Sequence, residues 1–166
     1  FSKISGYVTT TSSAEVNLTV ETLAVINFTT NVINFGSGRV NSGASHAALT
    51  TFSTSNVTGG NWTLQTAGGL RLQNIGNVNV SLNFSAAKNA ADFIGGTGPQ
   101  FKWNITNVEA NSCLNTTGTG DTGLNLNAFY DVNTTTTNFC PRLNYLDAAD
   151  TIRIDFNITV PADSKT

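Results

Sequence analysis

Residues 151–160 read Thr-Ile-Arg-Ile-Asp-Phe-Asn-Ile-Thr-Val, and apolar and polar side chains alternate over the whole stretch. Residues two apart in an extended strand share a face, so this stretch has one apolar and one polar face. Such a strand buries one side against a core, as strands of antiparallel sheets commonly do. Shorter runs of the same kind, some less regular, occur at residues 16–20, 23–28, 32–35, 62–64, 70–72, 78–84 and 101–105.

Turn signals separate these runs, including glycine pairs at residues 59–60, 68–69 and 95–96. Short strands with one apolar face and close spacing predict an all-β fold. We expect a two-sheet antiparallel β-sandwich of the jelly-roll or immunoglobulin-like kind. Helix formers gather only at residues 86–93, where Gly95 ends any helix within about two turns. Residues 111–123 read as a long loop.

The composition suits one domain with an arm, which we place at residues 14–166 and 1–13. Charged residues make up 11% of the 166 and the net charge is −2. A typical soluble protein has about 25% charged residues. The small negative net charge predicts no attraction to nucleic acid. The absence of Met predicts an exported product whose leader has been removed. No apolar run has the length of a membrane span.

N-glycosylation acceptor sequences, Asn-x-Ser/Thr, are unusually dense, at about twice the number that random placement predicts. They favour an extracellular glycoprotein, although an Asn- and Thr-rich β surface also accumulates such sequences by chance. Those within the expected strands lie on the side opposite the apolar face, so none of them has to be buried. The acceptors are Asn17, Asn27, Asn56, Asn61, Asn79, Asn83, Asn104, Asn115, Asn133 and Asn157.

The two cysteines, Cys113 and Cys140, are expected to form a disulfide, as cysteines of exported proteins usually do. The bridge would tether the 111–123 loop to the segment that follows residues 134–137. Two buried free thiols are the alternative. A metal site is disfavoured because neither cysteine has a cysteine or histidine close to it in the sequence, and His46 is the only histidine.

No catalytic residue is assigned, and we expect no enzyme. Ser45 and His46 are adjacent, which does not make a catalytic triad. A GxGxxG match at residues 118–123 lies in a loop with no helix after it, so a nucleotide site is not expected. No cofactor is expected apart from glycans, and calcium at Asp147 and Asp150, with Asp121 or Asp131, is disfavoured by the sparse acidic ligands.

Aromatic side chains could form a sugar-binding platform. However, Trp62 and Trp103 fall in the apolar register of their expected strands. Core packing is therefore the favoured interpretation for both.

The first thirteen residues are extended in character and have little apolar surface to bury by themselves. Such an arm can be disordered, pair within its own domain, or add as a strand to a neighbouring subunit. In the third case Ile4 and Val8, on one face, would fill pockets, while Gly6 would allow close backbone approach. Residues 12–13 would be the hinge into a first core strand at residues 16–20.

Residues 70–82, LRLQNIGNVNVSL, resemble a strand-turn-strand of archaeal surface proteins, and residues 152–163, IRIDFNITVPAD, resemble their final strand and its exit. With the arm, the chain is similar to archaeal pili linked by donor strands, the threads and bundling pili, and to biofilm fibre subunits of the TasA/camelysin type. The resemblance implies jelly-roll subunits whose N-terminal strand completes the next copy. It implies a donor strand at Phe1, Ile4, Tyr7 and Val8, and roles in adhesion and biofilm structure.

We therefore expect a structural subunit of an extracellular, cell-surface filament, a homopolymer of identical subunits formed by donor-strand complementation. Lateral bundling and contact with surface glycans are further expected interactions. Two alternatives remain open: a monomeric adhesin or carbohydrate-binding module, and a surface-layer component.

Overall fold

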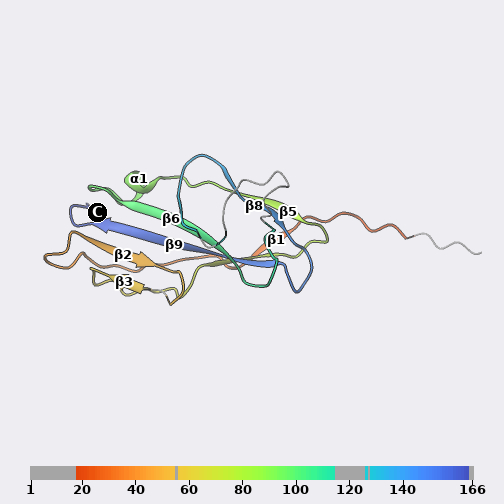
Figure 1. Ribbon diagram of the computed structural model, residues 1–166, viewed down its shortest axis with the longest axis horizontal. Coiled ribbons are helices and arrows are strands. Elements are labelled where there is room, and N and C mark those ends of the chain that lie inside the picture. The colour runs from red at the N-terminus through yellow and green to blue at the C-terminus, as the bar shows by residue number, and fades with distance from the viewer. Residues whose placement is uncertain (1–17, 55, 115–125, 127, 165–166) are drawn as a thin grey trace, which may run out of the picture.

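The computed structural model describes residues 18–54, 56–114, 126 and 128–164. The described part is mostly β, its strands pair antiparallel throughout, and one short helix interrupts them (Figure 1). The elements are β1 (Ile26–Thr30), β2 (His46–Thr50), β3 (Asn56–Thr58), β4 (Leu70–Asn74), β5 (Val80–Phe84), α1 (Ala90–Ile94), β6 (Gln100–Asn107), β7 (Tyr130–Asp131), β8 (Thr137–Leu143) and β9 (Thr151–Pro161).

The alternating stretch at residues 151–160 forms β9, the longest strand, and it organises the larger sheet. One edge of β9 pairs first with β4, at residues 151–154, and then with β2, at residues 157–161. Its other edge pairs with β6 over residues 152–159. With β1, β3 and β7 at its margins, this sheet has seven strands, while β5 and β8 form a separate sheet of two.

The core lies between the two sheets, where the apolar face of β9 meets β5 and β8. Phe84 of β5 packs against Trp103, Phe139 and Phe156, with ring centroids 5.9–6.3 Å apart. A smaller cluster of Ala47, Leu49 and Ile158 lies between β2 and β9. Phe84, Trp103, Phe156 and Ile158 are apolar positions of alternating strands, so their burial follows from the period-two pattern, whereas Phe139, Ala47 and Leu49 come from strands without clear alternation.

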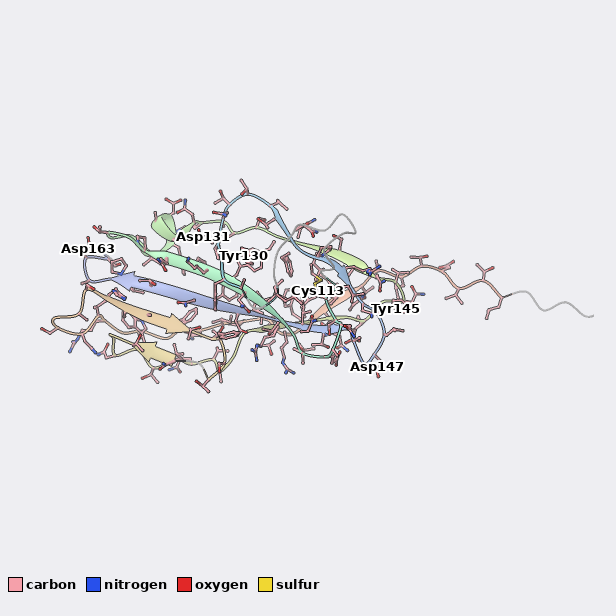
Figure 2. The ribbon with its side chains drawn as sticks, in the orientation of Figure 1. Cys113, Tyr130, Asp131, Tyr145, Asp147 and Asp163 are labelled. Atoms are coloured by element: carbon pink, nitrogen blue, oxygen red, sulfur yellow. A yellow bond between two sulfur atoms is a disulfide. The ribbon has the colours of Figure 1, made fainter. Side chains whose placement is uncertain are left out.

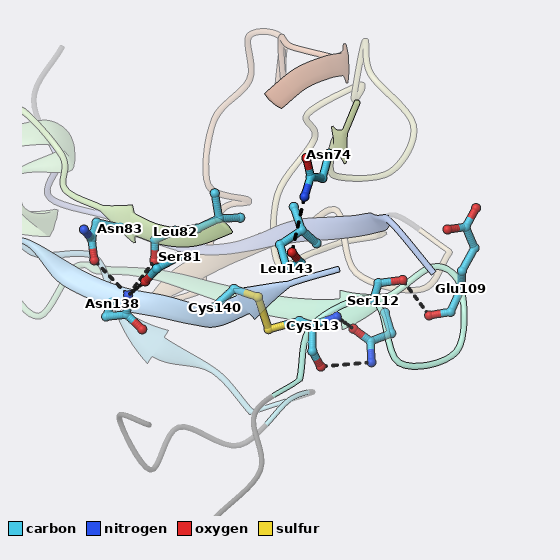
Figure 3. Close-up of a disulfide and its surroundings, with 11 residues drawn as sticks. Asn74, Ser81, Leu82, Asn83, Glu109, Ser112, Cys113, Asn138, Cys140 and Leu143 are labelled. Atoms are coloured by element: carbon cyan, nitrogen blue, oxygen red, sulfur yellow. Dashed lines mark hydrogen bonds between the residues drawn. A yellow bond between two sulfur atoms is a disulfide. The ribbon is translucent and has the colours of Figure 1, made fainter. Parts of the chain in front are cut away.

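The predicted disulfide between Cys113 and Cys140 is confirmed, with the two Cα atoms 5.8 Å apart (Figure 3). It joins the segment that follows β6 to the middle of β8. Both cysteines are buried, Cys113 to 2% exposure and Cys140 to 0%. The bridge therefore fastens the smaller sheet to the larger one, alongside the main core.

The short helix ends before Gly95, as the sequence predicts, but it begins at Ala90 and not at the predicted residue 86. The side chain of Asn89 caps the helix by accepting a hydrogen bond from the Asp92 backbone N–H, so α1 begins at Ala90. Gly95 ends it with a φ of 72°, a left-handed conformation that glycine adopts without strain.

Three expected strands are absent, and one of them is the run at residues 32–35, which lies between β1 and β2 and forms no strand. Residues 18–20, the described part of the 16–20 run, form no strand, and the first strand is β1. Residues 62–64 also lie outside the strands, since their neighbourhood makes only an isolated bridge between Val40 and Gly60. Alternation alone did not find β2 or β8, whose sequences HAALT and TNFCPRL show no clear period of two.

Candidate functional site

The seven-stranded sheet is larger than its two-stranded partner, and a hollow lies over part of its apolar face, where Phe156 and Ile158 are themselves only 7% and 5% exposed. Phe101, Phe156 and Ile158 form the floor, and Phe93 of α1 borders it. Phe93 stacks on Phe101 with a centroid separation of 5.2 Å, and Phe101 lies 5.6 Å from Phe156. The hollow has a volume of about 260 Å³, and its full lining is Asn31, Ile33, Phe35, Leu70, Phe93, Phe101, Phe156 and Ile158.

The same uncovered face continues toward β1, the edge strand of the large sheet. Phe28 is paired in register with Leu72, which is 2% exposed in the core, yet Phe28 itself is 43% exposed. Ile26, paired with buried Asn74, is 44% exposed. Paired residues of neighbouring strands lie on the same face. These two side chains therefore belong to the inner face, at a place where the second sheet does not reach.

Within the described residues, the smaller sheet has one edge without a neighbouring strand. Among the described strands, β5 pairs only with β8. An edge strand presents unpaired backbone N–H and C=O groups and accepts a further strand readily. An apolar groove and an open strand edge together are the two features that an incoming β-strand requires.

The segment before β1 leaves the body of the protein. Residues 21–25 are held to the turn after β4, because Leu23 N–H donates to Asn77 Oδ1 at 2.7 Å and Asn77 N–H donates to the Leu23 carbonyl at 2.9 Å. Upstream of this clamp, Leu18 is 85% exposed and Val20 is 72% exposed. The expectation that they belong to a core strand is wrong, because this segment projects away from both sheets (Figure 1).

The predicted donor residues lie outside the described residues. This holds for Phe1, Ile4, Gly6, Tyr7 and Val8, and for the GxGxxG match at residues 118–123. In an extended strand Leu18 and Val20 have the same parity, and so the same face, as Ile4, Gly6 and Val8.

Most described glycan acceptors lie on the surface. Asn157 is half-buried, and Asn17 and Asn115 fall outside the described residues. The exposed acceptors are Asn27, Asn56, Asn61, Asn79, Asn83 and Asn133.

Asn104 is the exception, and the expectation that it need not be buried is wrong: its exposure is 0%. It lies in β6, between β7 and β9, and is paired with Asp155, which is also 0% exposed. Asp155 accepts hydrogen bonds from Thr51 Oγ1 at 3.0 Å and Arg153 Nε at 2.6 Å. Among the described residues, neither Nδ2 nor Oδ1 of Asn104 has a hydrogen-bond partner.

Of the acidic residues considered for calcium, Asp150 and Asp131 have structural contacts, Asp147 is exposed, and Asp121 lies outside the described residues. Both carboxylate oxygens of Asp150 accept hydrogen bonds, from Gln73 Nε2 at 3.1 Å and Thr151 Oγ1 at 2.8 Å. Asp131 lies 3.6 Å from Lys102 Nζ. Within the described ranges, no three His, Cys, Asp or Glu side chains are grouped as metal ligands.

The other polar and aromatic candidates are placed as follows. Ser45 Oγ and His46 Nδ1 lie 3.0 Å apart, and both residues are exposed. Trp103 is 3% exposed in the core, which confirms its predicted packing role. Trp62 is half-buried and packs beside the Ala47, Leu49 and Ile158 cluster.

Comparison of the chain with protein-family models, with curated proteins and with solved structures found no match. Across the described part of the chain, no helix combines the length and the hydrophobicity that crossing a membrane requires.

Proposed function

We propose that this chain is a structural subunit of an extracellular filament, in which the N-terminal arm of one copy adds as a strand to the next. Two observations carry the proposal: the apolar groove over Phe101, Phe156 and Ile158, and the unpaired edge of β5, whose Phe84 packs against Phe156. In this view the two unequal sheets are a β-sandwich of the jelly-roll type that lacks one strand.

The arm has the chemistry that such a groove accepts. Its even-numbered residues include Ile4, Val8 and Val16, and continue through the exposed Leu18 and Val20. In an extended arm these apolar positions share one face, in two groups at residues 4–8 and 16–20 that are separated by Thr10 and Ser12. Backbone hydrogen bonds to β5 would supply affinity, and side chains seated on the groove floor would supply register.

A head-to-tail arrangement follows from this geometry. The arm and the groove are different surfaces of the same chain, so each copy both gives and receives a strand. Such heterologous contacts produce open filaments unless rotation closes them into a ring. Exposed acceptor asparagines support glycosylation of the filament surface, which would hydrate a chain that is only 11% charged. A role in adhesion accompanies this proposal.

Deletion of residues 1–22 tests the strand role. The truncated chain should form no polymer and should melt at a lower temperature than the full chain, because its groove stays empty. Adding a free peptide of residues 1–22 should restore the melting temperature, whereas a scrambled peptide of the same composition should not. Strand donation is rejected if the truncated chain assembles as the full chain does.

Glycan mapping tests the surface assignment. Peptide mass spectrometry of protein from its native source should find glycan on the six exposed acceptors, whereas Asn104 should be bare because its side chain is inaccessible in the folded state. If all six acceptors carry no glycan, the high number of acceptor sequences reflects only the Asn- and Thr-rich composition.

A further inference from the structure

Five exposed apolar side chains gather at one end of the molecule, and we call this surface the apolar tip. They come from the segment before β1 and from the turns after β4, β6 and β8. Their exposures run from 37% for Val108 to 56% for Leu146. The members are Leu23, Ile75, Val108, Tyr145 and Leu146.

Backbone hydrogen bonds hold the segments of the tip together. Ile75 N–H donates to the Val25 carbonyl at 3.0 Å, which joins the β4 turn to the N-terminal segment. Val108 N–H donates to the Thr151 carbonyl at 3.1 Å, which joins the end of β6 to the start of β9. These bonds fix the backbone that carries Ile75 and Val108 at this end of the molecule.

The arm leaves the body from this same end. Figure 2 shows Tyr145 and Asp147 at the end from which the N-terminal segment extends. Leu23 belongs to the tip, and the arm residues just before it, Leu18 and Val20, are also exposed. Apolar surface exposed to water is thus concentrated on the tip and on the base of the arm, which are contiguous.

We propose that a second copy of this chain seats directly on the apolar tip and receives the arm from its base onward, an inference that rests on the proposed strand exchange. If the neighbouring copy were connected only through an extended arm and did not contact the tip, then the tip, Leu18 and Val20 would stay exposed to solvent. A neighbour seated on the tip covers all of them at once, and burial of apolar surface favours that arrangement.

The opposite end of the molecule offers a matching surface. Helix α1 lies at the end away from the arm (Figure 1), and its Phe93 is 54% exposed at the border of the groove. In a head-to-tail filament, the tip of one copy meets the α1 end of the next. Arm entry and tip seating therefore converge on the same end of the receiving copy.

The test uses the full-length chain with Leu146→Glu, because Leu146 is exposed and its replacement leaves the fold intact. Ala67→Glu, at an exposed loop position before β4, is the control for added charge, and Leu146→Met is the conservative rescue. A ladder of denaturant-resistant oligomers on an unboiled SDS gel reports strand exchange. Electron microscopy reports filament straightness.

We expect all three variants and the wild type to give the ladder, and Leu146→Glu alone to lose straight filaments. Straight Leu146→Glu filaments would overturn the tip contact while leaving strand exchange in place. A wild type without any ladder would reject strand exchange, and the tip inference with it.

Discussion

Replacing the buried Asn104 by leucine should make the protein more stable, an unusual result for a core substitution. The Asn104 side chain has 0% exposure, and both of its polar atoms lack partners among the described residues. A buried polar group without a partner costs about 1–3 kcal/mol. Leucine has the same branching at Cγ and needs no hydrogen bond. Allowing for its larger volume, we expect a gain of about 1–2 kcal/mol in the free energy of unfolding.

Asn74→Leu is the matched control, because Asn74 is equally buried, at 1% exposure, but fully bonded. Its Nδ2 donates to the Val78 carbonyl at 2.8 Å and the Leu143 carbonyl at 3.3 Å. Its Oδ1 accepts from the Gly76 N–H at 3.1 Å. Losing three hydrogen bonds of about 1 kcal/mol each should destabilise the protein by about 3 kcal/mol. Figure 3 shows the contact between Asn74 and Leu143.

Urea and thermal unfolding, followed by circular dichroism, measure both changes in protein made in a host without N-glycosylation. At about 2–4 °C per kcal/mol for a chain of this size, Asn104→Leu should raise the melting temperature by about 2–8 °C, and Asn74→Leu should lower it. If the two substitutions destabilise the protein equally, the amide of Asn104 is satisfied in solution and the reasoning is refuted.

Three further predictions concern stability. Replacing Cys113 and Cys140 by serine should lower the free energy of unfolding by about 3–4 kcal/mol in the chain-entropy model for a 27-residue separation; an unchanged urea midpoint would contradict this. Gly69→Ala should cost about 1–3 kcal/mol, because an added Cβ would collide with a backbone carbonyl of β9, and a wild-type melting temperature would show that the strand yields freely. Lys102→Met should change stability by less than about 1 kcal/mol, because Asp131 is 72% exposed and the 3.6 Å pair is screened by water, and a loss above 2 kcal/mol in urea melts would oppose this.

The strand content and the disulfide were predictable because both depend on local rules. Alternation over residues 151–160 predicted β9 and its apolar face, where Ile152, Ile154, Phe156 and Ile158 are buried, but it did not predict that Thr151 and Asp155 on the polar face are buried too. Cys113 and Cys140 could pair only with each other. In contrast, β8 has little alternation and contains Pro141, so its place in the smaller sheet comes from pairing with β5.

The candidate site depends on coverage, which a linear pattern does not encode. Alternation placed Asn104 on the polar side of its strand, but the strands beside β6 and the contacts around Asp155 bury that side as well. The same rule placed Leu18 with core residues, whereas the chain leads it away from both sheets. Sequence by itself determined which side chains share a face of each strand, because that follows from the two-residue repeat. Only the tertiary structure decided which faces are covered, because coverage depends on how a sheet of seven strands packs against a sheet of two.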